Sequence, residues 1–384
     1  MSLAAAIRTA RSPSAALAAV GLFAGGFAAC VPEIKPGVNA TDAEFGLAMM
    51  MAAAGSITML AVAPRLIARL GRNALTIAGA AMLLVFLYPL VPETPAGFAV
   101  AMALVGVSLT FLDIGANIEI ARLETRHRRH LMNVGHAMFS FGFAAAALFA
   151  SVMRRFDADT PTIFGILMLA ALVLVRLMGP GLPRPAAEAA APGAAGPPWV
   201  PVLLTASILF ISFVAENATE VWSALHIERT LQGAHGLGGF GPVALGLTMG
   251  FGRLAGQVLA ERIGEVRLIQ WSTVAGAVGA AVTGIAAAPV VAVCGIAFIG
   301  IGVAVVVPSA NSILVRLVRP DQGPLAISRA WMLGFSGFFL GPSLMGLVAE
   351  SWGLRAVFLV LAAVLLLAVP LVQRLGSRRT AAQA

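Results

Sequence analysis

The chain has 384 residues, of which 59% are hydrophobic and 11% are charged, and its formal net charge is +8. Soluble domains carry about 25% charged residues, so this composition excludes a soluble globular protein. A membrane-crossing helix uses about 20 mostly apolar residues, and twelve of them would leave only short loops and tails. A sizeable domain outside the membrane is therefore excluded as well.

Uncharged runs separated by glycine, proline and charged residues predict twelve membrane-spanning helices. The uncharged run 268–315 is long enough for two helices, and we divide it at the Ala-Ala-Ala-Pro stretch 286–289. The expected fold class is an all-α membrane protein. The predicted spans are 14–33, 43–64, 73–91, 96–118, 134–154, 161–179, 200–222, 240–259, 268–287, 290–313, 328–349 and 355–373.

The stretch between the sixth and seventh predicted spans is rich in proline, alanine and glycine. Such a composition cannot bury a core and is typical of a linker. We therefore expect an N-terminal six-helix bundle over residues 1–179, a linker over 180–199 and a C-terminal six-helix bundle over 200–384.

The basic residues indicate the orientation of the chain. Of 25 basic residues, 24 are arginines scattered between apolar runs, a pattern that points to membrane topology and not to nucleic-acid binding. With Arg253 and Arg329 set aside as intramembrane, cytoplasmic termini place 18 basic residues inside and five outside. The positive-inside rule therefore predicts that both termini and the linker are cytoplasmic.

An internal repeat supports two related halves. A shift of 194 residues places Gly106 on Gly300 and Asn117 on Asn311, and a shift of 193 places Arg69 and Gly71 on Arg262 and Gly264. Parallel repeats of this kind are how one large class of transporters is built.

The loop Arg65–Arg72, after the second predicted span, resembles the signature of the major facilitator superfamily, Gly-x-Leu-Ala-Asp-Arg-x-Gly-Arg-Lys. Ala68 stands at the acidic position and Pro64 at the first glycine, whereas the second-half copy keeps an acid. The resemblance implies two pseudo-symmetric six-helix halves, with a cytoplasmic gating motif formed by Arg69, Gly71, Arg72, Glu261, Arg262 and Gly264.

Four shorter strings resemble the MosC-like branch, bacterial permeases linked to rhizopine-type inositol derivatives. They are Val31–Lys35, Leu112–Asn117, His136–Ser140 and Trp222–Leu225. The branch tends to carry an acid just before the tryptophan of the seventh helix, where this chain has Val221, with Glu220 one residue earlier. This resemblance implies a multi-pass protein of the bacterial cytoplasmic (inner) membrane, which we expect to be a monomer.

Ionisable groups inside predicted spans are the candidate functional residues, because a charge facing hydrocarbon is unfavourable. Asp113 and Asn117 lie four residues apart on one helix face, as do Glu216 and Glu220, with Asn217 beside them. These side chains are expected to bind the solute or to exchange protons. The alternative is that they only join neighbouring helices.

Several other side chains are weaker candidates for the same site. Trp222 is expected at the outer interface, Asn311 is the repeat partner of Asn117, and Trp331 could stack on a ring of the solute. Arg253 could pair with an acid or with an anionic solute. His136 could titrate, although its position favours a capping or packing role.

These features predict a secondary active transporter that moves a small polar organic solute, such as a sugar, polyol or amino sugar, by alternating access with proton coupling. A drug or metabolite exporter is the alternative, although the fourth span has no arginine before Arg122 and the fifth has no proline. A membrane-embedded enzyme or sensor is remote, since no set of catalytic groups converges. No cofactor or metal is expected, and Cys30 and Cys294 lie in apolar stretches.

Overall fold

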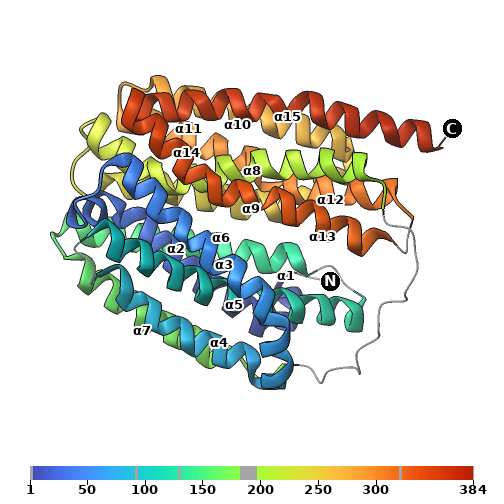
Figure 1. Ribbon diagram of the computed structural model, residues 1–384, viewed down its shortest axis with the longest axis horizontal. Helices are drawn as coiled ribbons and strands as arrows, with labels where there is room; N and C mark the ends of the chain where they lie inside the picture. Colours follow the sequence, from blue (N-terminus) through green and yellow to red (C-terminus); the bar gives the residue numbers. More distant parts are fainter. Residues whose placement is uncertain (1–2, 91–93, 129–130, 182–196, 320–321, 384) are drawn as a thin grey trace.

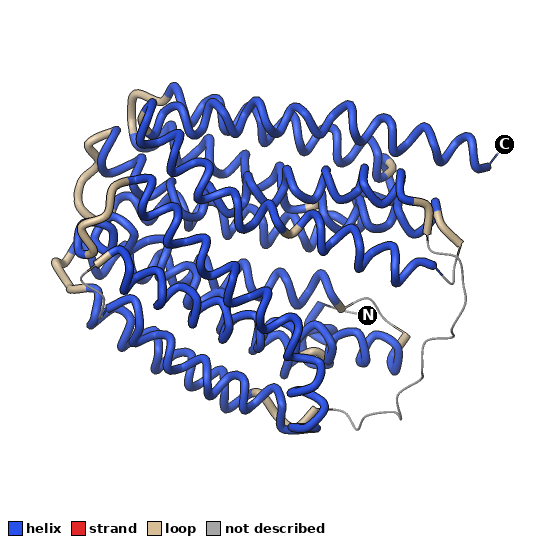
Figure 2. Tube along the Cα trace, viewed as in Figure 1, coloured by secondary structure: helices blue, strands red, loops and turns tan. Residues whose placement is uncertain are grey.

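The computed structural model describes residues 3–90, 94–128, 131–181, 197–319 and 322–383. Within these ranges the chain forms helices joined by loops, without a strand (Figure 2). The expected all-helical class is confirmed. The predicted linker 180–199 falls mostly on residues 182–196, which lie outside the described ranges.

The helices before residue 182 are called the N-terminal group here. Residues 3–9, which precede the first predicted span, are also helical. The group comprises α1 (Leu3–Thr9), α2 (Arg11–Gly37), α3 (Asp42–Leu70), η1 (Gly71–Asn73), α4 (Ala74–Leu83), η2 (Leu84–Leu90), α5 (Pro95–His127), α6 (Met132–Arg155) and α7 (Thr160–Leu177).

The helices after residue 196 are called the C-terminal group. This group comprises α8 (Trp199–Leu225), η3 (His226–Thr230), η4 (Leu237–Gly239), α9 (Phe240–Ile263), α10 (Glu265–Ile285), α11 (Pro289–Ala304), α12 (Val306–Leu317), α13 (Gly323–Gly334), α14 (Ser336–Trp352) and α15 (Leu354–Gln383).

Eleven segments of the described chain are long and apolar enough to cross a membrane. The predicted eighth span, 240–259, corresponds to α9, which is 24 residues long but is not among the eleven. α9 carries Arg253 and five glycines within its length. A helix of 24 residues is nevertheless long enough to cross the membrane.

Two predicted spans in the C-terminal group are not continuous helices. The span 290–313 is divided at Val305 between α11 and α12, and the span 328–349 at Phe335 between α13 and α14. Pro308 explains the first division, because a proline has no N–H to donate to the carbonyl four residues earlier, which is that of Ala304.

The two glycines that the 193-residue shift superposes each end a helix. Gly71 follows α3 with φ 60° and Gly264 follows α9 with φ 82°, and each amide bonds back to the carbonyl four residues earlier. A Cβ at either position would meet nothing within 4 Å, so the left-handed backbone, and not crowding, favours glycine there.

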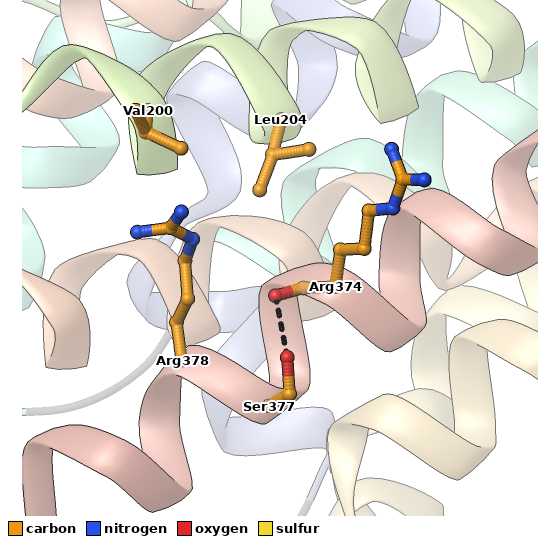
Figure 3. Close-up of a pocket in the computed structure, with 5 residues that line it drawn as sticks. All are labelled: Val200, Leu204, Arg374, Ser377 and Arg378. Carbon is orange, nitrogen blue, oxygen red and sulfur yellow. Dashed lines mark hydrogen bonds between the residues drawn. The ribbon is translucent and has the colours of Figure 1, made fainter.

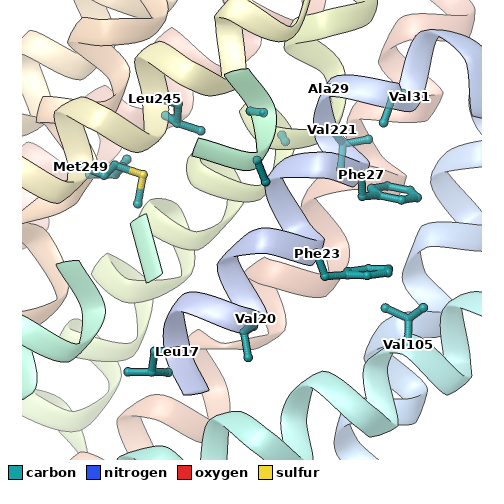
Figure 4. Close-up of a cluster of buried hydrophobic side chains, with 14 of the residues drawn as sticks. Leu17, Val20, Phe23, Phe27, Ala29, Val31, Val105, Val221, Leu245 and Met249 are labelled. Atoms are coloured by element: carbon teal, nitrogen blue, oxygen red, sulfur yellow. The ribbon is translucent and has the colours of Figure 1, made fainter. Parts of the chain in front are cut away.

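α2 lies at the centre of the packing. Its Phe23 and Phe27 point toward Val105 of α5, while Leu245 and Met249 of α9 lie on its other side (Figure 4). Ring contacts continue this core, with Phe23 edge-on to Phe86 at 5.4 Å between centroids. α2 is accordingly the most buried of the candidate membrane spans.

Glycines bring two helix pairs into backbone contact. A Cβ on Gly106 of α5 would lie 1.8 Å from the carbonyl oxygen of Ala52 in α3. α11 lies similarly close to α9 at Gly300, where an added Cβ would lie 2.1 Å from the Thr248 hydroxyl. The two glycines that the 194-residue shift superposes therefore both mark close helix crossings.

The two groups meet at the end of the bundle opposite the chain termini, which we call the closed end (Figure 1). There α3 packs on α14, and Ser343 of α14 donates a hydrogen bond to the Gly46 carbonyl over 2.8 Å. The other end, which carries both termini, is called the terminal end. Contacts between α6 and α9 continue from the closed end into the middle of the bundle.

Candidate functional site

Arg253 of α9 links the two groups inside the bundle. Its guanidinium donates to Glu216 Oε1 of α8 over 3.1 Å and to Ser140 Oγ of α6 over 2.6 Å. A further, longer hydrogen bond of 3.3 Å reaches the His136 carbonyl. One arginine thus connects a carboxylate of its own group with two acceptors of the N-terminal group.

Glu216 is one of three buried residues on α8 that carry a carboxylate or an amide side chain. Glu216, Asn217 and Glu220 are each less than 9% exposed, and the Asn217 amide donates to Glu220 over a long 3.5 Å. The spacing of four residues places Glu216 and Glu220 on one face of the helix. Arg253 is the cation paired with Glu216, which offsets part of the unfavourable free energy of burying a carboxylate.

A second polar pair lies on α5. The Asn117 amide donates to the Asp113 carboxylate over 3.0 Å and to the Asp113 carbonyl over 2.9 Å. Both partners belong to one helix turn, and both side chains are half-buried. In the described part of the chain, Asp113 makes no ion pair with Arg253, so the structure places the predicted candidates in two separate clusters.

Asn311, the repeat partner of Asn117, has a different environment. Its Oδ1 atom is buried and has no hydrogen-bond partner among the described residues. An unsatisfied buried carbonyl oxygen is unfavourable by about 1–3 kcal/mol. This atom is therefore available to accept a hydrogen bond.

Trp331 and Trp222 both lie against other aromatic rings. Trp331 contacts Phe213, with centroids 5.6 Å apart. Trp222 was expected at the outer interface, but that placement is wrong, because the side chain is 0% exposed. Its indole N–H donates to the Pro342 carbonyl over 3.3 Å, and its ring meets Phe45 edge-on. A satisfied N–H allows the indole to be buried deep in the bundle.

The residues of the predicted gating motif lie near the terminal end. Arg72 donates to the Gly181 carbonyl over 3.1 Å and accepts from the Gly181 amide over 2.8 Å, which fixes the chain after α7. Arg69, Glu261 and Arg262 are exposed and form no ion pair within the described ranges. The described residues thus show no salt bridge between the charged side chains of the predicted gating motif.

Ion pairs hold the two groups together at the closed end. Arg154 of α6 is 0% exposed and donates to Glu33 of α2 over 2.7 Å and to Glu228 of η3 over 2.8 and 2.9 Å. Thr160 and His235 also contact the Glu33 carboxylate. Arg154 is therefore a buried connector between the two groups.

A second ionic cluster at this end surrounds Asp42. Lys35 Nζ lies 3.0 Å from its carboxylate, and Arg229 of η3 donates to it over 2.8 Å. The Asp42 amide donates to Glu350 of α14 over 2.9 Å. These bonds again join the N-terminal group with the C-terminal group.

Sequence reasoning missed Ser140 and Arg154. Ser140 belongs to one of the strings that resemble the MosC-like branch, but nothing in its spacing indicates a bond to a residue 113 positions away. Arg154 and Arg155 follow each other at the end of a predicted span, and two adjacent arginines there are also typical of the start of an exposed loop. The described residues contain no group of three or more His, Cys, Asp or Glu that could hold a metal.

Comparison with known proteins identifies the family of the chain. The sequence profile of the Major Facilitator Superfamily matches residues 14–298 and again 205–383. An uncharacterised MFS-type transporter of Yersinia pestis is 25% identical over 350 residues, 88% of each chain. The membrane protein MosC of Rhizobium meliloti is 26% identical over 353 residues, 89% of this chain and 84% of MosC.

Solved structures agree on the fold. A D-xylose-proton symporter superposes with a TM-score of 0.76 at 15% identity, over 97% of both chains. The nucleoside transporter NupG superposes with a TM-score of 0.71 at 13% identity, over 98% of this chain and 99% of that one. The chain therefore belongs to the Major Facilitator Superfamily and is a membrane transporter, not an enzyme.

Proposed function

We propose that the protein is a secondary active transporter that moves a small polar organic solute across the bacterial cytoplasmic membrane by alternating access, coupled to protons. The observation that carries the proposal is the bond set of Arg253 with Glu216, Ser140 and the His136 carbonyl. This set joins the two groups inside the bundle, where a solute passing between them would meet it.

The proposed coupling step exchanges a proton on Glu216. As a carboxylate, Glu216 holds Arg253; once protonated, it has no charge to do so, and Arg253 is left to its N-terminal partners or to a polar group of the solute. Among the carboxylates of α5 and α8, Glu216 is the one bonded to an arginine that spans both groups. We therefore place it ahead of Asp113 and Glu220.

The proposed organisation has twelve spans, with α9 as the eighth, in two six-helix bundles over 1–179 and 200–384. The closed end, with its ionic clusters around Arg154 and Asp42, then faces the outside. Two relatives support the solute class, since one solved structure is named a D-xylose-proton symporter and another a nucleoside transporter.

The test begins with a thermal-shift screen of the purified protein against D-xylose, myo-inositol, glucosamine, uridine and a panel of drugs. The compound that stabilises the protein is then used for uptake into proteoliposomes with and without a pH gradient. Wild type is compared with Glu216→Gln and with Asp157→Asn, which removes an exposed carboxylate from the loop after α6.

We expect Glu216→Gln to abolish accumulation against a gradient while solute exchange continues, and Asp157→Asn to behave as wild type. Proton coupling through these acids is refuted if Glu216→Gln, Asp113→Asn and Glu220→Gln all accumulate solute at the wild-type rate. Stabilisation by drugs alone would replace the polar-solute proposal with the exporter.

A further inference from the structure

A pocket of about 410 Å³ lies at the terminal end, where α8 begins and α15 approaches its end. It is lined by Val200, Leu204, Arg374, Ser377 and Arg378 (Figure 3). The α15 side of the pocket is basic and hydroxylic, whereas the α8 side is apolar. The pocket lies apart from Arg253 and from the closed end, so neither the coupling site nor the ionic clusters account for it.

Two unneutralised arginines form the basic side of the pocket. Arg374 and Arg378 are four residues apart on α15, and both side chains extend toward α8 (Figure 3). Neither forms an ion pair with an acid in the part of the chain that the structure describes. Like charges at this spacing repel each other on a helix, so an anion between them would stabilise the arrangement.

The start of α8 adds to the positive potential. Pro198 precedes the helix with an extended backbone, and no side chain caps the first turn. Val200, which lines the pocket, is the second residue of this 27-residue helix. The uncapped N–H groups of a helix start carry a partial positive charge and favour anions.

The pocket lies where the apolar run of α8 begins and that of α15 ends. The candidate membrane span of α8 begins at Trp199, and the uncharged run 356–373 of α15 ends just before Arg374. Trp199 is 52% exposed, and the Arg329 guanidinium lies 4.7 Å from the centre of its ring. Tryptophan and arginine at a helix end are typical of the headgroup region. Val200 and Leu203 are exposed apolar side chains that continue from this level along α8.

We propose that this pocket binds the phosphate group of an anionic phospholipid, with the acyl chains lying along Val200 and Leu203. Arg374, Arg378 and the start of α8 would hold the phosphate, whereas the Ser377 hydroxyl already donates to the Arg374 carbonyl over 3.1 Å (Figure 3). Inorganic phosphate shares the headgroup chemistry, but only a lipid also uses the apolar side of the pocket. The site is independent of the solute that the protein carries.

The test measures lipid binding to the full-length protein in detergent by native mass spectrometry. Phosphatidylglycerol, phosphatidylcholine and inorganic phosphate are the three probes. We compare wild type with Arg374→Gln/Arg378→Gln, with Arg374→Lys/Arg378→Lys, and with Val200→Phe, which fills the pocket and leaves both arginines. Arg65→Gln/Arg126→Gln removes two exposed arginines elsewhere at the terminal end and is the matched control.

Phosphatidylglycerol should bind wild type in preference to phosphatidylcholine. The double glutamine variant and Val200→Phe should each raise its dissociation constant by about tenfold or more, a change of about 1.4 kcal/mol. The lysine variant and the control should stay within a few fold of wild type. Unchanged affinity in both the glutamine variant and Val200→Phe overturns the site, and displacement of the lipid by inorganic phosphate overturns the lipid as its occupant.

Discussion

Arg154 and Glu228 form a two-bond ion pair, with N to O distances of 2.8 and 2.9 Å, between α6 of the N-terminal group and η3 of the C-terminal group. The same guanidinium donates to the Ala29 carbonyl over 2.9 Å, next to Cys30. Opening of the closed end must break this pair. We therefore expect the pair to limit access to Cys30, which is 0% exposed.

Arg154→Gln should loosen the closed end, because it leaves the carboxylates of Glu33 and Glu228 without their buried cation. Removing one partner of a buried ion pair costs about 3–5 kcal/mol. With Cys294 replaced by serine, the rate at which a maleimide labels Cys30 should rise by more than about tenfold, since a tenfold change needs only about 1.4 kcal/mol. Arg155→Gln, next to it and exposed, is the control. Equal rates in both variants would show that Arg154 does not hold this end shut.

The orientation of the bundle can be tested with single cysteines in a background without Cys30 and Cys294. Gly37 and Thr125 are both exposed, Gly37 at the closed end and Thr125 near the terminal end of α5. In intact cells, a membrane-impermeant maleimide should label Gly37→Cys, and Thr125→Cys should react only after the membrane is opened. The reverse pattern would invert the proposed topology.

Asn311→Ala should weaken solute binding more than Asn117→Ala. Asn311 Oδ1 is a buried acceptor without a partner in the described chain, whereas the Asn117 amide already bonds to Asp113. One lost hydrogen bond is worth about 0.5–1.5 kcal/mol, so the dissociation constant of the solute found by thermal shift should rise up to about tenfold. A lower melting temperature of the empty protein with unchanged affinity would assign Asn311 to packing.

Gly106→Ala and Gly300→Ala should both destabilise the protein, since each new methyl group meets atoms of the neighbouring helix. Overpacking of this kind typically costs about 1–3 kcal/mol. Gly165→Ala is the control, because a Cβ there has nothing within 4 Å and alanine favours helix. Thermal unfolding in detergent should rank Gly165→Ala at or above wild type and the other two below it. Equal melting temperatures for all three would contradict the close crossings.

Local pattern was enough to predict most of the long helices, because each is an apolar run that ends at charges, glycine or proline. Thr41 and Glu44, for example, form the capping box that starts α3. Contacts between helices were harder to predict from the sequence. Arg253 does pair with an acid, as considered from the sequence, but which acid depends on how α8 and α9 pack. Trp222 looked interfacial because it ends an apolar run, and only the partners Pro342 and Phe45 show why it is buried.

The backbone contacts at Gly106 and Gly300 also bear on how such a molecule could move. At Gly106 the nearest atoms all belong to the Ala52 backbone, so no rotamer change can ease the sliding of α3 along α5; at Gly300 the Thr248 hydroxyl lies nearest, followed by the Leu245 carbonyl of α9. Between α6 and α9, in contrast, Gly246 and Gly250 face the rings of Phe143 and Phe141, which can reorient. The helices of such a glycine-mediated pair would then move as one rigid unit. The relative movement that a transport cycle needs would take place between the pairs, where Phe141 and Phe143 can change rotamer.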